Sequence, residues 1–269
     1  MLRLAIFGIT GRMGQSILRV LRSETRWRLS GAVASCTSGR LGQDAAGDGQ
    51  PSGVQVTSDP HAALTDAQGR KAAVAVDFSA AAAVAAHARA CAAAGVPLLI
   101  GTTGLDAECQ AAVNQAAEKV AILLAPNTSL GVGVLAELVR VAAAALPRSY
   151  DVEIHEAHHR MKRDAPSGTA LKLGETIAQA RAQTLAEVAV YDRHGANAPR
   201  APGSIGFSVL RAGDIVGEHT VIFAGAGERL EITHRASDRD VFARGALLAA
   251  EWLAGRSPGA YSMHDVLSQ

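Results

Sequence analysis

Histidine and lysine side chains gather in one segment, His155–Leu171, whose sequence is HEAHHRMKRDAPSGTAL. Three of the nine histidines fall in its first five residues, and Lys162 follows His158 by about one helical turn. Only four of the 26 basic residues are lysines. Because lysine, unlike arginine, can donate a proton at an accessible pKa, an amine kept beside histidines indicates proton-transfer chemistry.

A turn of small residues follows in the same segment. Ser167, Gly168 and Thr169 precede an apolar-periodic run, so a helix is expected to begin there, with Ser167 or Thr169 near its N-cap. Backbone N–H groups at a helix start bind anions, typically phosphate or carboxylate. The segment therefore predicts a proton donor beside an anion site. The alternative is a solvated basic turn before an ordinary helix.

The N-terminal residues have the pattern of a dinucleotide-binding turn. Leu2–Phe7 reads as a strand, GITGRMG follows with Gly8, Gly11 and Gly14, and a helical pattern comes next. Glycines there permit a tight turn and let a pyrophosphate approach the helix start. A glycine turn with no ligand is the alternative.

The second strand, Leu29–Ala34, lacks the acid that would hold a ribose 2′-hydroxyl, because it runs into Ser35-Cys36-Thr37. Hydroxyls at Ser35 and Thr37, with Arg40 nearby, tolerate a 2′-phosphate better than a carboxylate would. This favours NADPH over NADH. A plain solvated loop from Ser35 to Gly53 remains the alternative.

Further strands and helices alternate up to about residue 124. The expected strands are Ala73–Phe78, Val96–Ile100 and Ala121–Leu124, and the expected helices are Ala80–Ala94 and Asp106–Lys119. This alternation predicts a doubly wound parallel sheet, which binds ligands at the carboxyl ends of its strands. Gly101–Gly104 and Ala125–Ser129 thereby become candidate cofactor loops. His87, on the Ala-rich helix, is expected to be packed or half-exposed and not a ligand.

The pattern changes after Ser129. It predicts a helix to about Leu146, a strand at Asp151–Ala157, a helix at Leu171–Ala182, and strands at Ile205–Arg211, Glu218–Phe223 and Arg229–Arg235. Successive strands without intervening helices predict an antiparallel or mixed sheet, and hence a second, α+β domain. The last helical run, Val241–Leu253, fits either domain.

Composition excludes several classes of protein. The net charge of +1 and the 48% hydrophobic and 19% charged content of the 269 residues give no electrostatic basis for binding nucleic acid or anionic membranes. Cys36, Cys91 and Cys109 are odd in number and widely spaced, so neither a disulfide framework nor a metal site is expected. With no signal-peptide or transmembrane pattern, we expect a soluble cytoplasmic protein.

Over nearly its whole length the sequence resembles the 4-hydroxy-tetrahydrodipicolinate reductases, or dihydrodipicolinate reductases, of lysine and diaminopimelate synthesis. The resemblance rests on GITGRMG, DFS at Asp77–Ser79, GTTG at Gly101–Gly104, EAHHRMKRDAPSGTAL at Glu156–Leu171, and RAGDIVGEHTVIF at Arg211–Phe223 leading into ERLEITHRASDR. It implies a Rossmann-like dinucleotide-binding domain at 1–126 with 240–269. It also implies a substrate-binding and oligomerisation domain at 127–239, and often a homotetramer.

The resemblance also implies roles for residues. His158 would be the acid/base histidine and Lys162 the proton donor, while His159, Ser167, Gly168 and Thr169 would hold a carboxylate of a small dicarboxylate substrate. Cofactor contacts, for NADPH or NADH, would come from Gly8, Ile9, Thr10, Gly11, Arg12, Met13, Ser35, Gly101, Thr102, Thr103, Ala125, Pro126, Asn127 and Thr128. The implied reaction is NAD(P)H-dependent reduction of 4-hydroxy-tetrahydrodipicolinate to tetrahydrodipicolinate with loss of water.

The sequence departs from this family in two places. Ser35-Cys36 stands where an acidic and then a basic residue are common, which leaves the choice between NADPH and NADH open. Thr128 replaces a frequent aromatic residue. Two other functions also remain open: a Rossmann-type reductase of another imino or oxo acid, and a nicotinamide-binding regulatory protein without catalysis.

Overall fold

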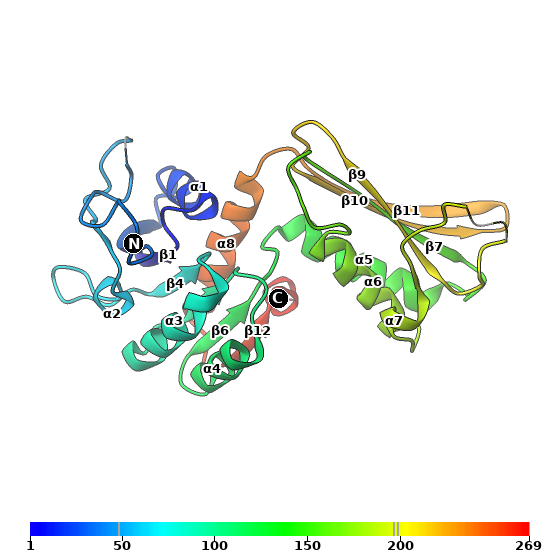
Figure 1. The fold of residues 1–269 in the computed structure, drawn as a ribbon. Coiled ribbons are helices and arrows are strands. Elements are labelled where there is room, and N and C mark those ends of the chain that lie inside the picture. The colour runs from blue at the N-terminus through cyan, green and yellow to red at the C-terminus, as the bar shows by residue number, and fades with distance from the viewer. Residues whose placement is uncertain (48, 196, 198, 269) are drawn as a thin grey trace. The chain divides into compact units, whose positions relative to one another are not determined.

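The computed structural model describes residues 1–47, 49–195, 197 and 199–268, and it divides the chain into two compact units (Figure 1). Unit 1 comprises Met1–Leu130 with Asp240–Gln269, and unit 2 comprises Gly131–Arg239. Within the described residues, the helices are too short or too polar to cross a bilayer.

Unit 1 is built on a seven-stranded sheet with the order β12-β6-β5-β4-β1-β2-β3, in which every pairing is parallel. Its strands are β1 (Leu2–Phe7), β2 (Trp27–Val33), β3 (Val56–Thr57), β4 (Val74–Asp77), β5 (Leu98–Ile100), β6 (Ala121–Leu124) and β12 (Gly259–Ser262). The order reverses at β1, whose neighbours are β2 and β4. Such a reversal opens a crevice at the carboxyl ends of the strands, so the predicted doubly wound parallel sheet is confirmed.

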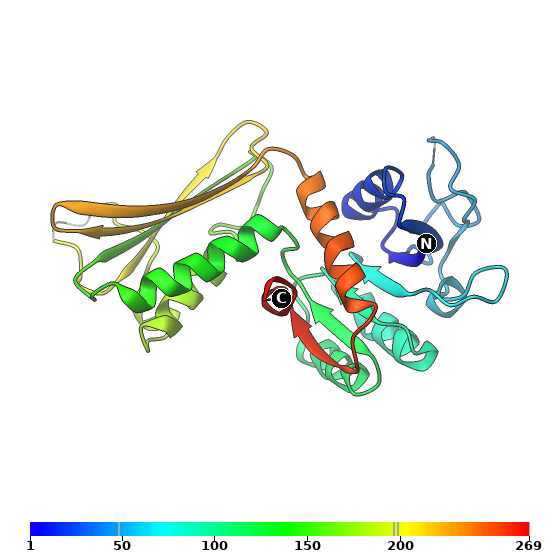
Figure 2. The same ribbon diagram turned by 180° about the vertical axis from the view of Figure 1, so that it is seen from behind.

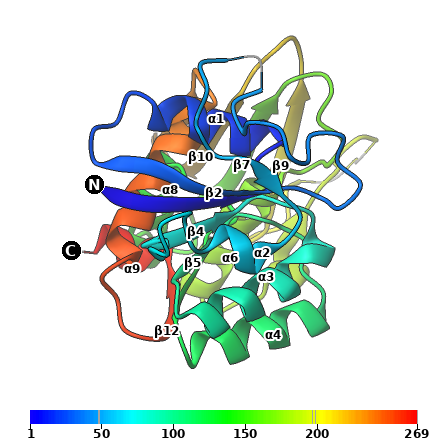
Figure 3. The same ribbon diagram turned by 90° about the vertical axis from the view of Figure 1, so that its left-hand side faces the viewer.

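Helices cover both faces of this sheet, as Figure 3 shows for α1 and α8 on one side and α3 and α4 on the other. The helices are α1 (Arg12–Leu21), α2 (Pro60–Ala63), α3 (Ala81–Ala94), α4 (Ala107–Ala117), α8 (Asp240–Leu253) and α9 (Met263–Leu267). Along β1, Leu4 and Ile6 enter one core and Ala5 and Phe7 the other. Apolar residues on both faces make the strand a continuous hydrophobic run.

The helix α8 lies in unit 1, whereas its helical pattern in the sequence fitted either domain. Its inner side buries Ala246 and Ala250 in the core that also contains Ile17 of α1. At Gly245 the helix comes so close to the backbone of Thr128 that an added Cβ would lie 1.8 Å from the carbonyl oxygen. The loop after β6 is therefore held by a helix from the far end of the chain.

Unit 2 contains a five-stranded sheet with the order β11-β10-β7-β9-β8. The strands are β7 (Asp151–His158), β8 (Ala189–Val190), β9 (Ile205–Arg211), β10 (Gly217–Gly225) and β11 (Glu228–Ala236), and the helices are α5 (Leu130–Ala145), α6 (Gly168–Ala180) and α7 (Leu185–Val188). The helices α5 and α6 pack on one face of the sheet (Figure 2). Among the described residues of this unit, no helix covers the other face.

The predicted mixed sheet is confirmed, but its antiparallel part is smaller than the sequence suggested. β10 pairs antiparallel with both β11 and β7, whereas β9 runs parallel to β7 and to β8. The reason is that α6 lies between β7 and β9 in the chain and serves as the crossover that a parallel pair needs. β7 therefore lies between β9 and β10, and both its neighbours reach its carboxyl-terminal end.

Candidate active site

The glycine turn of unit 1 has no room for a side chain at Gly8 or at Gly14. Gly8 has a φ of +80°, and its N–H donates to the carbonyl of Val33 at 2.9 Å. A Cβ on Gly8 would lie 2.6 Å from the carbonyl oxygen of Phe78, and one on Gly14 would lie 2.4 Å from that of Gly8. The turn thus leads directly into α1 with Gly11 at its N-cap. The first N–H groups of a helix have no partner within it and can bind an anion.

Two more loops lie at the same edge of this sheet, because β1, β4, β5 and β6 are adjacent parallel strands. The N–H of Gly101 donates to the carbonyl of Asp77 at 2.9 Å, and the N–H of Ala125 donates to that of Ile100 at 2.9 Å. The Thr128 hydroxyl is buried and donates to the carbonyl of Phe242 on α8 at 2.7 Å. Unit 1 thus brings the predicted cofactor residues at 8–13, 101–103 and 125–128 to one edge.

The loop after β2 places two hydroxyls at the predicted ribose position. The side-chain oxygens of Ser35 and Thr37 are exposed and lie 2.9 Å apart. Arg40 points elsewhere, because its Nη2 donates to the carbonyls of Asp44 at 2.9 Å and Ala45 at 3.2 Å. Ser35, as expected, lies at the carboxyl end of β2, while Arg40 holds the following loop.

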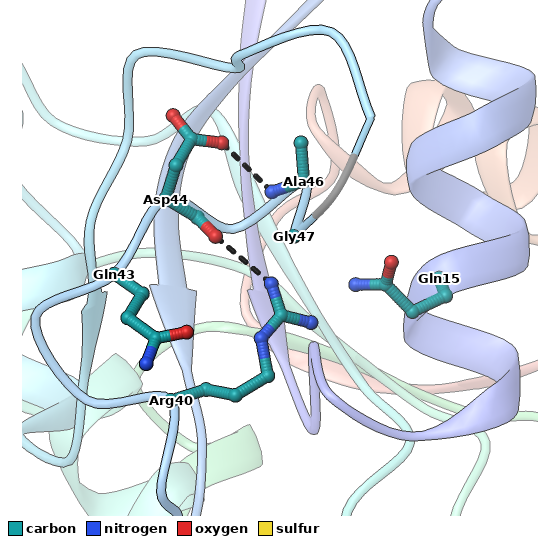
Figure 4. A pocket seen from close by; sticks show the side chains of 6 residues that line it. All are labelled: Gln15, Arg40, Gln43, Asp44, Ala46 and Gly47. Carbon is teal, nitrogen blue, oxygen red and sulfur yellow. Dashed lines mark hydrogen bonds between the residues drawn. The ribbon is translucent and has the colours of Figure 1, made fainter.

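A cavity of about 400 Å³ lies beside this loop, lined by Gln15, Arg40, Gln43, Asp44, Ala46 and Gly47 (Figure 4). Gln15 on α1 connects the loop to the glycine turn by donating to the carbonyls of Ile9 at 2.8 Å and Ala45 at 3.0 Å. Burial opposes ionisation of Asp44, but hydrogen bonds from Ser52, Ala46 and Gly53 outweigh it and lower the pKa of this carboxyl to about 2. Asp44 therefore orders the loop, so the loop is more than a solvated connection.

In unit 2 the inner face of the sheet changes from apolar to polar along two strands. On β7, Val152 and Ile154 face the core, and Glu156 and His158 continue the same alternate positions. On β10, His219 continues the inward positions of Val221 and Phe223 in the same way. The polar end of this face is where α6 begins.

Glu156 is the centre of that polar end and is fully buried. Its carboxylate accepts from both Nη atoms of Arg211 at 2.7 Å, from the backbone N–H of Ser167 at 2.9 Å, and from Nδ1 of His158 at 2.6 Å. Neither Glu156 nor Arg211 was predicted from the sequence to have a role. The signal was present, because Glu156 lies on the predicted strand Asp151–Ala157, two residues before His158, and Arg211 begins the RAGDIVGEH segment.

The hydrogen bonds fix the tautomer of His158. Burial favours the neutral form of Glu156, but the bonds from Arg211, His158 and Ser167 outweigh burial and lower the pKa of this carboxyl. An ionised carboxylate only accepts, so Nδ1 of His158 carries the proton. Burial, together with the charges of Lys162 and Arg211, lowers the pKa of His158. At neutral pH its Nε2 is therefore an unprotonated acceptor.

Lys162 lies on the turn that follows β7. Its Nζ donates to Asp164 at 2.8 Å, and its side chain is 22% exposed. Its backbone N–H donates to the carbonyl of His159 at 3.1 Å, and Nη2 of Arg211 donates to the carbonyl of Asp164 at 2.6 Å. The same arginine therefore holds both Glu156 and the lysine turn.

The predicted anion turn is the first turn of α6. Ser167 is the N-cap, and its hydroxyl accepts from the N–H of Ala170 at 3.2 Å. The helix begins at Gly168, before the predicted Leu171, because this cap satisfies one of its first N–H groups. Thr169 is half-buried on that turn, and His159, also half-buried, lies just beyond β7. His158, His159, Lys162, Ser167, Gly168 and Thr169 are thus all placed in unit 2.

His219 is a further member that the sequence analysis missed. Its ring is 3% exposed, meets that of His158 edge-on at a centroid distance of 5.2 Å, and has its Nε2 3.0 Å from the Ser167 hydroxyl. Burial lowers its pKa to about 4. His219 is therefore a second neutral imidazole, in contact with that of His158.

Comparison with known proteins identifies the family. Sequence profiles described as "Dihydrodipicolinate reductase, N-terminus" and "Dihydrodipicolinate reductase, C-terminus" match residues 2–128 and 131–267. The chain belongs to the dihydrodipicolinate reductase family. The resemblance found in the sequence is thereby confirmed, and the chain is an NAD(P)H-dependent reductase of the diaminopimelate and lysine pathway.

Individual relatives match this chain over almost its whole length. The 4-hydroxy-tetrahydrodipicolinate reductases of Anaeromyxobacter dehalogenans (strain 2CP-C) and Nitrosomonas eutropha (strain DSM 101675 / C91 / Nm57) are each 49% identical, over 269 and 268 residues, covering 99% of this chain and 98% of the relative. Among solved structures, the dipicolinate-bound dihydrodipicolinate reductase from Paenisporosarcina sp. TG-14 is 26% identical with a TM-score of 0.79. That match covers 99% of this chain and 100% of the other.

The depressed pKa of His219 predicts a specific dependence of stability on pH. Between pH 6.5 and 4 the unfolded chain takes up a proton on this residue that the folded chain does not, so the free energy of unfolding falls as the pH is lowered. On going from pH 7.5 to 4.5, wild type should lose about 2–3 kcal/mol more than the variant His219→Gln. Urea unfolding at both pH values measures the difference.

The measurement at pH 7.5 serves as the control. At that pH the histidine is neutral in both the folded and the unfolded chain, so the difference in unfolding free energy between wild type and variant reports only the effect of the substitution itself. Equal losses on acidification in wild type and variant would contradict the assignment of His219 as a buried neutral imidazole.

Proposed function

We propose that residues 1–126 with 240–269 hold the nicotinamide cofactor, and that residues 127–239 hold 4-hydroxy-tetrahydrodipicolinate and deliver its proton. The observation that supports this most is the network around Glu156, which joins a neutral histidine, the lysine turn and a helix start in one unit. A proton donor beside an anion-binding turn suits a cyclic imine that carries carboxylates. The product is tetrahydrodipicolinate, formed with loss of water.

The cofactor residues are those of the glycine turn and the two loops beside it. The chain fits a dinucleotide, because Gly8 and Gly14 let the turn pack closely on itself and on the backbone of Phe78, and α1 begins directly after it with its first N–H groups. Bound there, the nicotinamide supplies the hydride. We assign the contacts to Gly8, Ile9, Thr10, Gly11, Arg12, Met13, Ser35, Gly101, Thr102, Thr103, Ala125, Pro126, Asn127 and Thr128.

Lys162 is the proton donor in this proposal, and His158 is not. His158 has its proton on Nδ1, where the Glu156 carboxylate accepts it, and Nε2 carries only a lone pair. The Lys162 ammonium carries protons that it can give up. The role of His158 is to accept a hydrogen bond from the substrate and hold it in position. Gly217 leaves space for this ring, since a Cβ there would lie 3.1 Å from Nε2.

The first turn of α6 binds a substrate carboxylate together with His159. Gly168 and Thr169 follow the N-cap Ser167, so their N–H groups and the positive end of the helix dipole face an anion. The solved relative from Paenisporosarcina sp. binds dipicolinate, which supports a small dicarboxylate ligand for this chain.

NADPH is the preferred cofactor in our proposal. Ser35 and Thr37 present hydroxyls where a carboxylate would repel a 2′-phosphate, and both are exposed after β2. Arg40 does not contact the cofactor in this proposal. Its Nη2 donates to backbone carbonyls, so it contributes only by holding the loop after β2.

Residues of unit 2 are also proposed to form a homotetramer in the cytoplasm. Among the described residues of unit 2, no helix covers one face of the sheet, and β9 exposes Leu210 on that face, since Ile205 and Phe207 of the same strand face the core. Cys36, Cys91 and Cys109 are free thiols, as expected in a reducing compartment. Light scattering of the purified protein should give a mass of four chains, and a monomeric mass would contradict this assembly.

Replacing Lys162 by methionine tests the proton donor. The change keeps an unbranched side chain and removes the ammonium, so kcat should fall by roughly 10²–10⁴-fold. The dissociation constant for NADPH should not change, since Lys162 lies in the unit assigned to the substrate. The assay generates the substrate from pyruvate and aspartate semialdehyde and follows nicotinamide absorbance.

Lys172→Met is the matched control, because Lys172 is an exposed lysine on α6 that also pairs with a carboxylate, at 3.2 Å from Glu175. It should keep the wild-type rate. Wild-type turnover by Lys162→Met would assign the donor elsewhere, and no NAD(P)H oxidation by the wild type would remove the proposed reaction.

Ser35→Asp tests the choice of cofactor. A carboxylate there should accept from the 2′-hydroxyl of NADH and repel the 2′-phosphate of NADPH, so the ratio of kcat/KM for NADPH over NADH should fall by roughly tenfold or more. The isosteric control Ser35→Asn, which adds no charge, should change the ratio much less. An unchanged ratio in Ser35→Asp would show that this position does not face the ribose.

A further inference from the structure

A second buried carboxyl group lies in unit 1, at the end of β4. Asp77 is fully buried, and its Oδ2 lies 2.7 Å from Nδ1 of His87 on α3. Its Oδ1 accepts from the backbone N–H of Ser79 at 2.8 Å and from the Thr102 hydroxyl at 3.4 Å. Neither Asp77 nor His87 has a part in the reaction described above. A buried carboxyl group is costly unless donors surround it, so the pair needs an explanation.

His87 is well fixed at its position. Its ring is 6% exposed and packs against that of Phe7 on β1 at a centroid distance of 4.6 Å. The rest of the inner side of α3 is small and apolar, with Val84, Ala88 and Cys91 in the same core. The one polar group that this helix sends into the core therefore meets the carboxyl of Asp77.

The segment that Asp77 holds supports both proposed nicotinamide loops. The N–H of Phe78 donates to the carbonyl of Phe7 at 3.0 Å, directly before the glycine turn, and the carbonyl of Phe78 lies against Gly8. On the other side, Gly101 donates to the carbonyl of Asp77, and the Thr102 hydroxyl donates to that of Ser79 at 3.2 Å. The 77–79 segment therefore lies between the loops after β1 and β5 and contacts each of them.

We propose that the Asp77–His87 pair is a positioning device for cofactor binding, which holds the loops at Gly8 and Gly101 in the geometry that the nicotinamide dinucleotide needs. This inference rests on the proposed cofactor site. His87 supplies the donor that keeps the Asp77 carboxyl turned toward Ser79 and Thr102. Without that donor, the carboxyl seeks another partner and the 77–79 segment moves with it. The pair acts through the loops and does not touch the reacting atoms.

His87→Leu tests the proposal, because it removes the donor and keeps an apolar side chain in the core. The dissociation constant and the KM for NADPH should rise roughly ten- to a hundredfold, as expected when binding loops are misplaced by about 1 Å. The value of kcat at saturating NADPH should stay within about twofold, since the groups of unit 2 are untouched. Cofactor titration by fluorescence and steady-state kinetics give the three constants.

His87→Asn and His87→Gln form a matched pair that remains informative if the leucine variant does not fold. The amide nitrogen of asparagine lies near the place of Nδ1 and can still donate to Asp77, whereas that of glutamine lies near Nε2 and cannot. Asparagine should restore cofactor affinity to within about threefold of wild type, and glutamine should not. Equal affinity in the two variants would overturn the proposal.

Val84→Ala separates positioning from loss of stability. Val84 is fully buried on the same helix and in the same core, but it makes no hydrogen bond to Asp77. It should lower the melting temperature and leave the NADPH dissociation constant unchanged, and weakened binding there would overturn the inference. If wild type itself binds neither NADPH nor NADH, the proposed function fails. If wild type binds and the His87 variants bind equally well, only the present inference fails.

Discussion

The buried carboxylate of Glu156 is the constraint on which the active site of unit 2 depends. A charge that is taken out of water costs several kcal/mol unless donors replace the lost solvent. Three segments provide those donors: β7 through His158, the start of α6 through Ser167, and β9 through Arg211. The satisfaction of one carboxylate thus fixes the tautomer of the histidine, the position of the anion turn and, through Arg211, the lysine turn.

The two units use the same construction for different purposes. In each, a fully buried carboxyl group at the end of a strand accepts from Nδ1 of a histidine and from a backbone N–H. In unit 2 the third partner is the cation of Arg211, so this network contains a fixed positive charge near His158 and the lysine turn. In unit 1 the third partner is the neutral hydroxyl of Thr102, and the result is a rigid loop edge without added charge.

In the proposed reaction, the neutral histidine and the lysine have different roles. His158 is surrounded by Arg211, Lys162 and apolar burial, all of which favour its uncharged form. A neutral ring with its proton directed at Glu156 does not act as an acid in this proposal, which assigns that role to the partly exposed Lys162. The proposed mechanism thus assigns substrate positioning and protonation to two different side chains.

Much of this protein was determined by local sequence. The strands β1, β6 and β9 begin and end at the predicted residues, and the helices α3 and α4 lie within one or two residues of theirs, because hydrophobic period, caps such as Asp106 and the stop at Gly95 are local signals. The segment β12–α9 was not predicted, and the placement of α8 in unit 1 was implied by the family resemblance and not by the helical pattern itself. They depend on pairing between distant parts of the chain, such as Gly245 against Thr128.

The candidate site could likewise be predicted only where its residues are neighbours in the sequence. Spacing alone singled out the glycine turn and the segment from His155 to Leu171, since their chemistry lies in neighbouring residues. The partners that set their charge states are far away in sequence: Arg211 is 55 residues from Glu156, and His219 is 52 from Ser167. A sequence pattern shows which groups can do chemistry. Only tertiary structure decides which nitrogen of His158 carries the proton, because burial and long-range hydrogen bonds set it.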